Sequence, residues 1–166
     1  MHRFQLISLG EIDEKARAEV LKSLSAPDRE RMERMRGLRR DNFVAGRWLL
    51  LRDGVDISRI RYVNRKPMVD GVYFSISHED TLTVATTDAA PIGIDIERIK
   101  PISDSIKRSF NMPAEMLDED FIEWFTRKEA YIKLRGLGMN HMADDVSVYK
   151  FETERLGDYL ITICQA

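Results

Sequence analysis

Two acidic residues, Asp95 and Glu97, alternate with isoleucines in residues 91–98. Alternate side chains of a strand point to the same face, so a strand here would project both carboxylates from one face and the isoleucines from the other. Neighbouring carboxylates repel each other unless a cation lies between them. Mg²⁺ suits such a place, because it is typically held by one or two carboxylates together with phosphates and water. The pattern predicts a magnesium site or, with about equal weight, the solvated end of an ordinary strand.

A second candidate lies on the helix expected over residues 119–134. Glu129 and Lys133 are four residues apart and share one helix face, and Phe121 and Phe125 extend that face as an apolar stripe anchored in the core. A carboxylate beside aromatic rings can act as a metal ligand or a base, and a lysine one turn on can hold a phosphate. A helix-stabilising Glu–Lys pair, worth about 0.2–0.5 kcal/mol, is the simpler interpretation of this segment taken alone.

Ser77 and His78 stand at the end of an expected strand, where they can contact a phosphate or cap a turn. A serine hydrolase does not fit, because no G-x-S-x-G elbow and no separated triad are present. Arginines are concentrated upstream, and guanidinium groups bind phosphates in bidentate fashion. The cluster consists of Arg29, Arg31, Arg34, Arg36, Arg39, Arg40, Arg47 and Arg52. Acidic residues are interspersed, so a solvated helix face is the commoner explanation.

Composition limits the classes of protein to which these residues can belong. The chain has 166 residues, 43% of them hydrophobic and 33% charged, with a formal net charge of -2, which predicts one globular domain. A single cysteine excludes an intrachain disulfide and a cysteine-based metal site, and the three histidines are scattered. No apolar run reaches the roughly 20 residues of a membrane span, and residues 1–15 lack a signal-peptide pattern. We therefore expect a reduced, soluble, cytoplasmic protein with no membrane or nucleic-acid partner.

The elements that must position the candidate residues follow from periodicity and turn signals. Helices are expected over residues 11–24, 28–35, 39–52 and 119–134. Strands are expected over residues 4–9, 61–63, 72–77, 82–87, 92–97, 146–151 and 159–164. The order of a helix and then paired strands occurs twice. This predicts an α+β fold, a single unit over residues 1–166 with pseudo-symmetric halves of about 1–95 and 96–166, although helix-then-hairpin is also a common arrangement.

The order of the motifs is more specific than any one of them. S-I-S-H (75–78) precedes G-I-D-I-E (93–97), which precedes F-T-R-K-E-A-Y-I-K-L-R-G-L-G (125–138). Together with G-R-W-L-L-L-R (46–52) and R-K-P (65–67), this order resembles the Sfp-type 4′-phosphopantetheinyl transferases over roughly residues 27–138. That family uses Mg²⁺ and moves the phosphopantetheine arm of coenzyme A onto a serine of a carrier protein. The resemblance implies the same fold, the same enzyme class, coenzyme A as co-substrate and an apo acyl or peptidyl carrier protein as partner.

The resemblance also implies roles for individual residues. The Mg²⁺ ligands would be Asp95, Glu97 and Glu129, and the catalytic residues Asp95, Glu129 and Lys133, with Glu129 or a metal-linked water deprotonating the carrier serine. Coenzyme A would be bound by Arg31, Arg47, Lys66, Ser77, His78 and Lys133. Arg29 competes with Arg31 for its position, and Glu115 is a weaker candidate for the base. Two departures from the family pattern are Glu79, where a second serine is frequent, and Phe125, where a tryptophan is frequent.

Two alternatives remain beside this hypothesis. A Mg²⁺-dependent nuclease combines similar residues, but its E-x-K pair lies on a strand, whereas Glu129 and Lys133 are spaced for a helix. A domain that binds coenzyme A or a carrier protein without transfer would not need all three acids. The repeated helix-and-strands pattern favours a monomer, and the strand expected over residues 159–164 favours a trimmed complete fold over a fragment.

Overall fold

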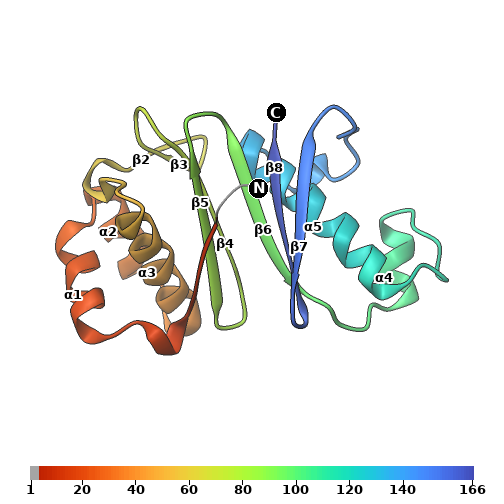
Figure 1. Cartoon of the computed structure of the whole chain (residues 1–166), viewed down its shortest axis with the longest axis horizontal. Helices are drawn as coiled ribbons and strands as arrows, with labels where there is room; N and C mark the ends of the chain where they lie inside the picture. Colours follow the sequence, from red (N-terminus) through yellow and green to blue (C-terminus); the bar gives the residue numbers. More distant parts are fainter. Residues whose placement is uncertain (1–3) are drawn as a thin grey trace.

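The computed structural model describes residues 4–166, in which two antiparallel sheets lie side by side (Figure 1). The first sheet has the order β1-β5-β4 and contains β1 (Gln5–Ser8), β4 (Tyr73–Glu79) and β5 (Leu82–Asp88). The second has the order β6-β8-β7 and contains β6 (Ile92–Arg98), β7 (Lys150–Leu156) and β8 (Tyr159–Gln165). A separate hairpin pairs β2 (Arg61–Val63) with β3 (Lys66–Met68).

Helices cover the two sheets on opposite sides of the molecule. The first sheet is covered by α1 (Glu14–Ser23), α2 (Ala26–Glu33) and α3 (Gly37–Arg52), and the second by α4 (Asp104–Ser109) and α5 (Asp118–Arg135). Short 3₁₀ turns are η1 (Leu9–Glu11), η2 (Ile57–Arg59) and η3 (Met139–His141). None of the helices in residues 4–166 is both long enough and apolar enough to cross a membrane.

The two halves repeat one arrangement. In each, a first strand precedes a long helix and a hairpin, and the second strand of the hairpin pairs with the first strand: β1, α3, β4 and β5 correspond to β6, α5, β7 and β8. This confirms the predicted α+β fold of two pseudo-symmetric halves. The division near residue 95 is displaced, because all of β6 pairs with β8. The sheets divide at residues 89–91, between β5 and β6.

Local sequence explains where most elements begin and end. Ser25 Oγ accepts the backbone N–H of Asp28 at the start of α2, where Pro27 occupies the first turn. Gly136 ends α5 in the left-handed region, with φ 68°. One expected strand was displaced, and one strand was missed. Residues 146–149 form a turn, so β7 begins only at Lys150. The strand β3 was missed because Asn64 and Arg65 make a tight turn with φ 49° and 68°.

The sheets are joined between β4 and β6, the neighbouring edge strands in Figure 1. The isoleucines of β6 are buried with Val84 and with Ile161 and Ile163 of β8, as the alternation in residues 92–97 predicted. Ser75 Oγ accepts the backbone N–H of Ile94 at 3.0 Å. At the end of the sheets, Asp80 accepts a hydrogen bond from Tyr159 Oη at 3.3 Å and pairs with Arg98 at 3.6 Å. Polar contacts therefore fix the two halves at their shared edge.

Candidate active site between the two halves

The packing of α5 on β6 brings the acidic motif to the helical motif. Gly93 permits this packing, because a Cβ at this position would lie 1.9 Å from the carbonyl oxygen of Ala130 and 2.7 Å from the nitrogen of Leu134. Side chains of a strand alternate between faces, so Gly93, Asp95 and Glu97 all point toward the side covered by the helix. The acids therefore lie under α5 and not on an open strand face.

Asp95 is the most buried member of the group, with an exposed fraction of 2%. Its Oδ1 accepts hydrogen bonds from Ser77 Oγ at 2.8 Å and from Lys133 Nζ at 2.5 Å, and Lys133 Nζ also lies 2.6 Å from Ser77 Oγ. Three motifs far apart in the sequence therefore meet at one carboxylate oxygen. The second oxygen, Oδ2, is buried and has no hydrogen-bond partner.

Glu97 and Glu129 are half-buried beside Asp95, and their pKa values report the crowding of negative charge. Burial, followed by repulsion from Asp95 and Glu79, raises the pKa of Glu97 to about 7. Burial and repulsion from Asp95 also raise the pKa of Glu129, against the opposing charge of Lys133. Both groups would be more stable as carboxylates if a further cation lay among them.

A divalent ion fits this donor set. Within the described part of the chain, no three acidic, imidazole or thiol groups already converge into a metal cluster, and Lys133 is the cation that neutralises Asp95. However, the unpartnered Oδ2 of Asp95 is a buried oxygen that needs a donor or an ion. Two further carboxylates with raised pKa values lie near it, and oxygen ligands of this kind suit Mg²⁺.

A cavity of about 410 Å³ opens beside this cluster, between the two halves. Its walls come from α3, the β2–β3 hairpin, β4 and the C-terminal end of α5. The charged side chains and the imidazole in its wall are those of Arg39, Arg47, Arg65, Lys66, His78 and Lys133. Such a wall attracts an anionic ligand. Burial, and then the charge of Lys133, lowers the pKa of His78, so its imidazole is neutral near pH 7.

The predicted site residues are not all placed alike. His78, Lys66 and Lys133 line the cavity, and Lys66 Nζ donates to the carbonyl oxygen of Leu134 at 2.7 Å, while burial lowers its pKa. Ser77 is buried and contacts Asp95 and Lys133. These contacts make it a support of the acid cluster, whereas the sequence suggested direct contact with a ligand.

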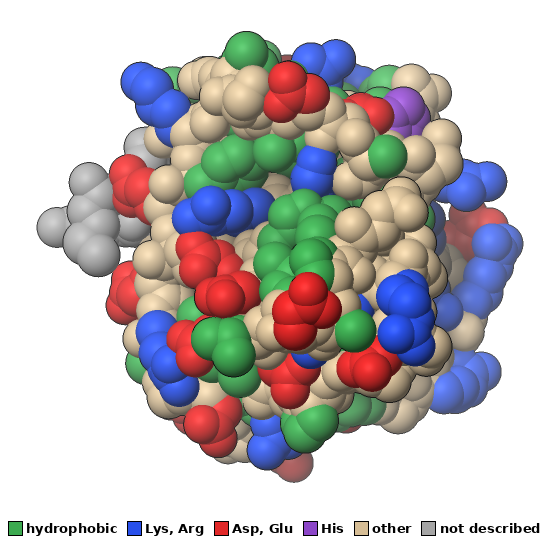
Figure 2. All heavy atoms as spheres, turned by 90° about the vertical axis from the view of Figure 1, so that its right-hand side faces the viewer, with side chains coloured by type: hydrophobic (Ala, Val, Ile, Leu, Met, Phe, Trp, Pro, Cys, Tyr) green, Lys and Arg blue, Asp and Glu red, His purple; other side chains and the backbone are tan. Residues whose placement is uncertain are grey.

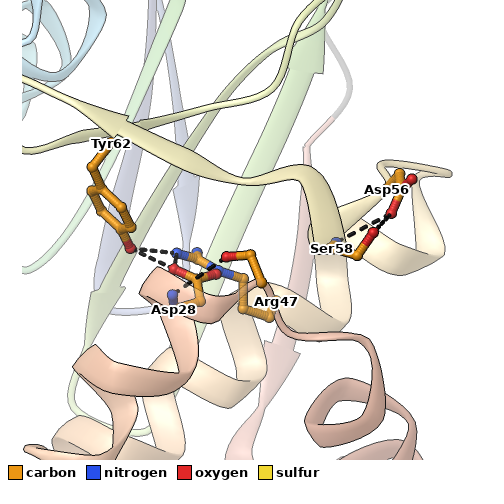
Figure 3. Close-up of polar contacts among 6 residues, drawn as sticks. Asp28, Arg47, Asp56, Ser58 and Tyr62 are labelled. Atoms are coloured by element: carbon orange, nitrogen blue, oxygen red, sulfur yellow. Dashed lines mark hydrogen bonds and ion pairs between the residues drawn. The ribbon is translucent and has the colours of Figure 1, made fainter.

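Arg47 lines the cavity as well, but its charge is paired inside the protein. It is 4% exposed, and its Nε and Nη2 atoms lie 2.5 and 3.0 Å from the two oxygens of Asp28. Figure 3 shows this pair together with Tyr62. The guanidinium is therefore already neutralised. Arg31 is exposed and stacks over Tyr62, whereas Arg29 donates to the carbonyl oxygen of Leu21 and is held toward the end of α1.

The edges of the site hold residues that depart from the family pattern and residues that the sequence did not assign to the site. Glu79 pairs with Lys100 Nζ at 3.2 Å, so its carboxylate is held by a cation beyond the end of β6. Glu115 is exposed between α4 and α5, and no hydrogen bond joins it to the acid cluster within residues 4–166. The sequence placed Arg39 in the arginine cluster and Arg65 in the R-K-P motif without assigning either to the site, although both line the cavity. Only the pairing of β2 with β3 brings Arg65 there.

Comparison with known proteins identifies the class to which this fold and site belong. Residues 91–165 match the model of the 4′-phosphopantetheinyl transferase superfamily. This stretch includes Asp95, Glu97, Glu129 and Lys133, so the acid cluster and its lysine lie in the matched half.

Individual relatives agree with this class. The chain is 37% identical over 91 residues to the 4′-phosphopantetheinyl transferase psf-1 of Bacillus pumilus, covering 47% of this chain and 39% of the relative. It is 32% identical over 110 residues to the 4′-phosphopantetheinyl transferase Sfp of Bacillus subtilis (strain 168), covering 57% and 49%. It is 31% identical over 127 residues to the 4′-phosphopantetheinyl transferase AcpT of Salmonella typhimurium, covering 66% of each.

The chain belongs to the 4′-phosphopantetheinyl transferase superfamily, and its similarity to Bacillus Sfp and psf-1 confirms the Sfp-type resemblance. The alignments span about half or less of the Bacillus relatives.

Proposed function

We propose that this chain transfers the 4′-phosphopantetheine group of coenzyme A to a serine of an apo acyl or peptidyl carrier protein, releasing 3′,5′-ADP. The proposal depends on one observation, which is that the acid cluster and the cationic cavity lie next to each other. Asp95, with an unpartnered buried oxygen and two acids beside it, adjoins a cavity whose wall carries several cations. A phosphoryl transfer needs a metal site and an anion site next to each other.

Asp95, Glu97 and Glu129 would hold Mg²⁺, which when bound supplies charge stabilisation at the pyrophosphate. The basic wall of the cavity would hold the phosphates of coenzyme A. Lys133 is suited to this role because its amine lies at the boundary between the acids and the cavity. His78 and Lys66 would bind further parts of the coenzyme from β4 and β3.

Glu129 is the residue that we propose as the base for the carrier serine. Burial and repulsion from Asp95 raise its pKa, which makes its carboxylate a better proton acceptor than that of an ordinary glutamate. The nucleophile belongs to the carrier, so the chain needs no triad of its own. The proton of the serine hydroxyl would pass to Glu129 as the serine oxygen attacks the β-phosphoryl group.

The carrier would dock on the side of α2 and α3. Carrier proteins are usually acidic, and Arg39 and Arg40 are exposed there, with no ion-pair partner among the described residues. The opposite side, over α4 and α5, presents apolar, acidic and basic side chains together (Figure 2). A monomeric state and a cytoplasmic location remain predictions.

Release of 3′,5′-ADP from coenzyme A in the presence of apo carrier protein and Mg²⁺ tests the proposal. The wild-type protein should release it, and Asp95→Ala should abolish release while its circular dichroism spectrum stays native. If Asp95→Ala keeps full activity, the metal assignment is wrong. A protein that binds coenzyme A and never releases 3′,5′-ADP would be the non-catalytic binder, and cleavage of DNA with Mg²⁺ would identify the nuclease.

A further inference from the structure

Tyr62 joins three segments of the first half. It lies on β2, and its hydroxyl donates to Asp28 Oδ1 at 2.6 Å and accepts from Arg47 Nη2 at 3.1 Å (Figure 3). Asp28 belongs to α2 and Arg47 to α3. The hydroxyl therefore locks the ring of Tyr62 in one orientation relative to both helices.

The Asp28–Arg47 pair is closed to an outside ligand. The side chains of Asp28 and Arg47 are 0% and 5% exposed, and two hydrogen bonds join them. Pulling Arg47 away toward a ligand would leave the carboxylate of Asp28 buried and unpaired, which is strongly unfavourable. The hydroxyl of Tyr62 adds to this pair, and burial raises the pKa of Tyr62 to about 12, so its hydroxyl keeps its proton.

Arg31 is the guanidinium that stays available. Its Cζ lies 4.4 Å from the centre of the Tyr62 ring, it is exposed, and it forms no ion pair with any residue of 4–166. Its neighbour Arg29 is bound to a backbone carbonyl. A ring face attracts a guanidinium and holds it without neutralising it, whereas a carboxylate partner would cancel its charge.

We propose that Tyr62 is a positioning residue that holds Arg31, by its ring, toward the 3′-phosphate of coenzyme A. This role rests on the proposed function. The Asp28–Arg47 pair fixes Tyr62 through the hydroxyl, and the ring in turn presents Arg31. Arg47 lines the cavity, but here its role is structural, because it helps to fix the hydroxyl of Tyr62. Arg31 supplies the free positive charge.

Isothermal titration calorimetry compares the binding of two ligands, coenzyme A and dephospho-coenzyme A. The variants are Tyr62→Leu, Tyr62→Phe, Arg31→Ala and the double variant Arg31→Ala/Tyr62→Leu. Tyr62→Leu removes the ring and should weaken coenzyme A binding about two- to fivefold, the usual size of an exposed cation–π contact. Tyr62→Phe keeps the ring but loses the hydroxyl that locks it, so it should cause a smaller loss than Tyr62→Leu. Neither change should alter the affinity for dephospho-coenzyme A, which lacks the 3′-phosphate.

The double variant separates positioning from a general loss of structure. If Tyr62 acts through Arg31, Tyr62→Leu has no further effect on coenzyme A affinity once Arg31 is alanine. Equal losses for both ligands, or additive losses in the double variant, would overturn the role of Tyr62. No binding of coenzyme A by the wild-type protein would overturn the proposed function and this role with it, whereas normal binding with no effect of Tyr62→Leu would overturn the role alone.

Discussion

Gly93→Ala tests how the site is assembled. In the folded protein the added Cβ would lie 1.9 Å from the carbonyl oxygen of Ala130, and ordinary contacts of this kind lie at 3.4–4 Å. Helix α5 must therefore move away from β6 by about 1.5 Å. The atoms that obstruct the methyl group belong to helix backbone, so no side-chain rotation can relieve the contact.

The expected cost follows from this geometry. Overpacking by a methyl group usually costs about 1–3 kcal/mol when side chains can adjust. Here the helix itself must move, so we expect a loss of at least about 3 kcal/mol in the free energy of unfolding. The reduced freedom of the unfolded chain with alanine returns only about 0.4–1 kcal/mol. Against a typical total of about 5–15 kcal/mol this is a large fraction.

Equilibrium unfolding in urea measures this loss, with Trp48 on α3 and Trp124 on α5 as fluorescence probes of the two halves. Gly10→Ala is the matched control, because a Cβ there meets no atom within 4 Å. It should change the free energy of unfolding by less than about 1 kcal/mol. If Gly93→Ala is as stable as Gly10→Ala, α5 does not pack on β6 as described, and the placement of Glu129 and Lys133 beside Asp95 fails with it.

Three further predictions concern the cluster and the core. In metal-free buffer, Glu97→Gln should be more stable than wild type at pH 8 and equally stable at pH 4. The folded-state pKa of Glu97 is raised from 4.5 to about 7, so the stability of the wild type falls as the pH rises between these two values. The loss is at most about 3 kcal/mol, and it is smaller because the group is partly solvated. Identical pH profiles in urea unfolding would contradict the crowding of the acids. Lys133→Gln leaves Asp95 without its cation and should lower the free energy of unfolding in metal-free urea by about 1–3 kcal/mol. This value is below that of a fully buried pair, because the lysine is 29% exposed. The control Lys150→Gln, at an exposed lysine, should cost almost nothing. Equal effects of the two lysine substitutions would refute the Asp95 pairing. Cys164 is fully buried and its thiol pKa is raised to about 12, so iodoacetamide should label it at pH 8 only after denaturation, as mass spectrometry would show; rapid labelling of the folded protein would contradict its burial.

Periodicity was a sufficient guide to the long elements. The helix expected over residues 119–134 is α5 within a residue at each end, because its apolar stripe and Gly136 both follow general rules. The alternation of isoleucines with acids in β6 likewise predicted which side chains share a face. These patterns are local, and local patterns are readable without the fold.

The state of the acids depends on contacts that no local pattern contains. The strand pattern left open whether Asp95 lies in a metal site or at a solvated strand end, and only the structure shows that α5 covers this face and buries it. Gly93 between two isoleucines was the available signal, since a glycine inside a strand often marks a close backbone approach. The role of Arg47 was also hidden, because its partner Asp28 is 19 residues away and has the sequence context of an ordinary first-turn acid.

The decisive measurement is the mass of an apo carrier protein after incubation with this protein, coenzyme A and Mg²⁺. We expect the carrier to gain the mass of one 4′-phosphopantetheine group. We also expect Asp95→Ala or omission of Mg²⁺ to prevent the gain. An unchanged mass for each of several acyl and peptidyl carriers, with folded protein and bound coenzyme A, would contradict the claim that this chain is a phosphopantetheinyl transferase.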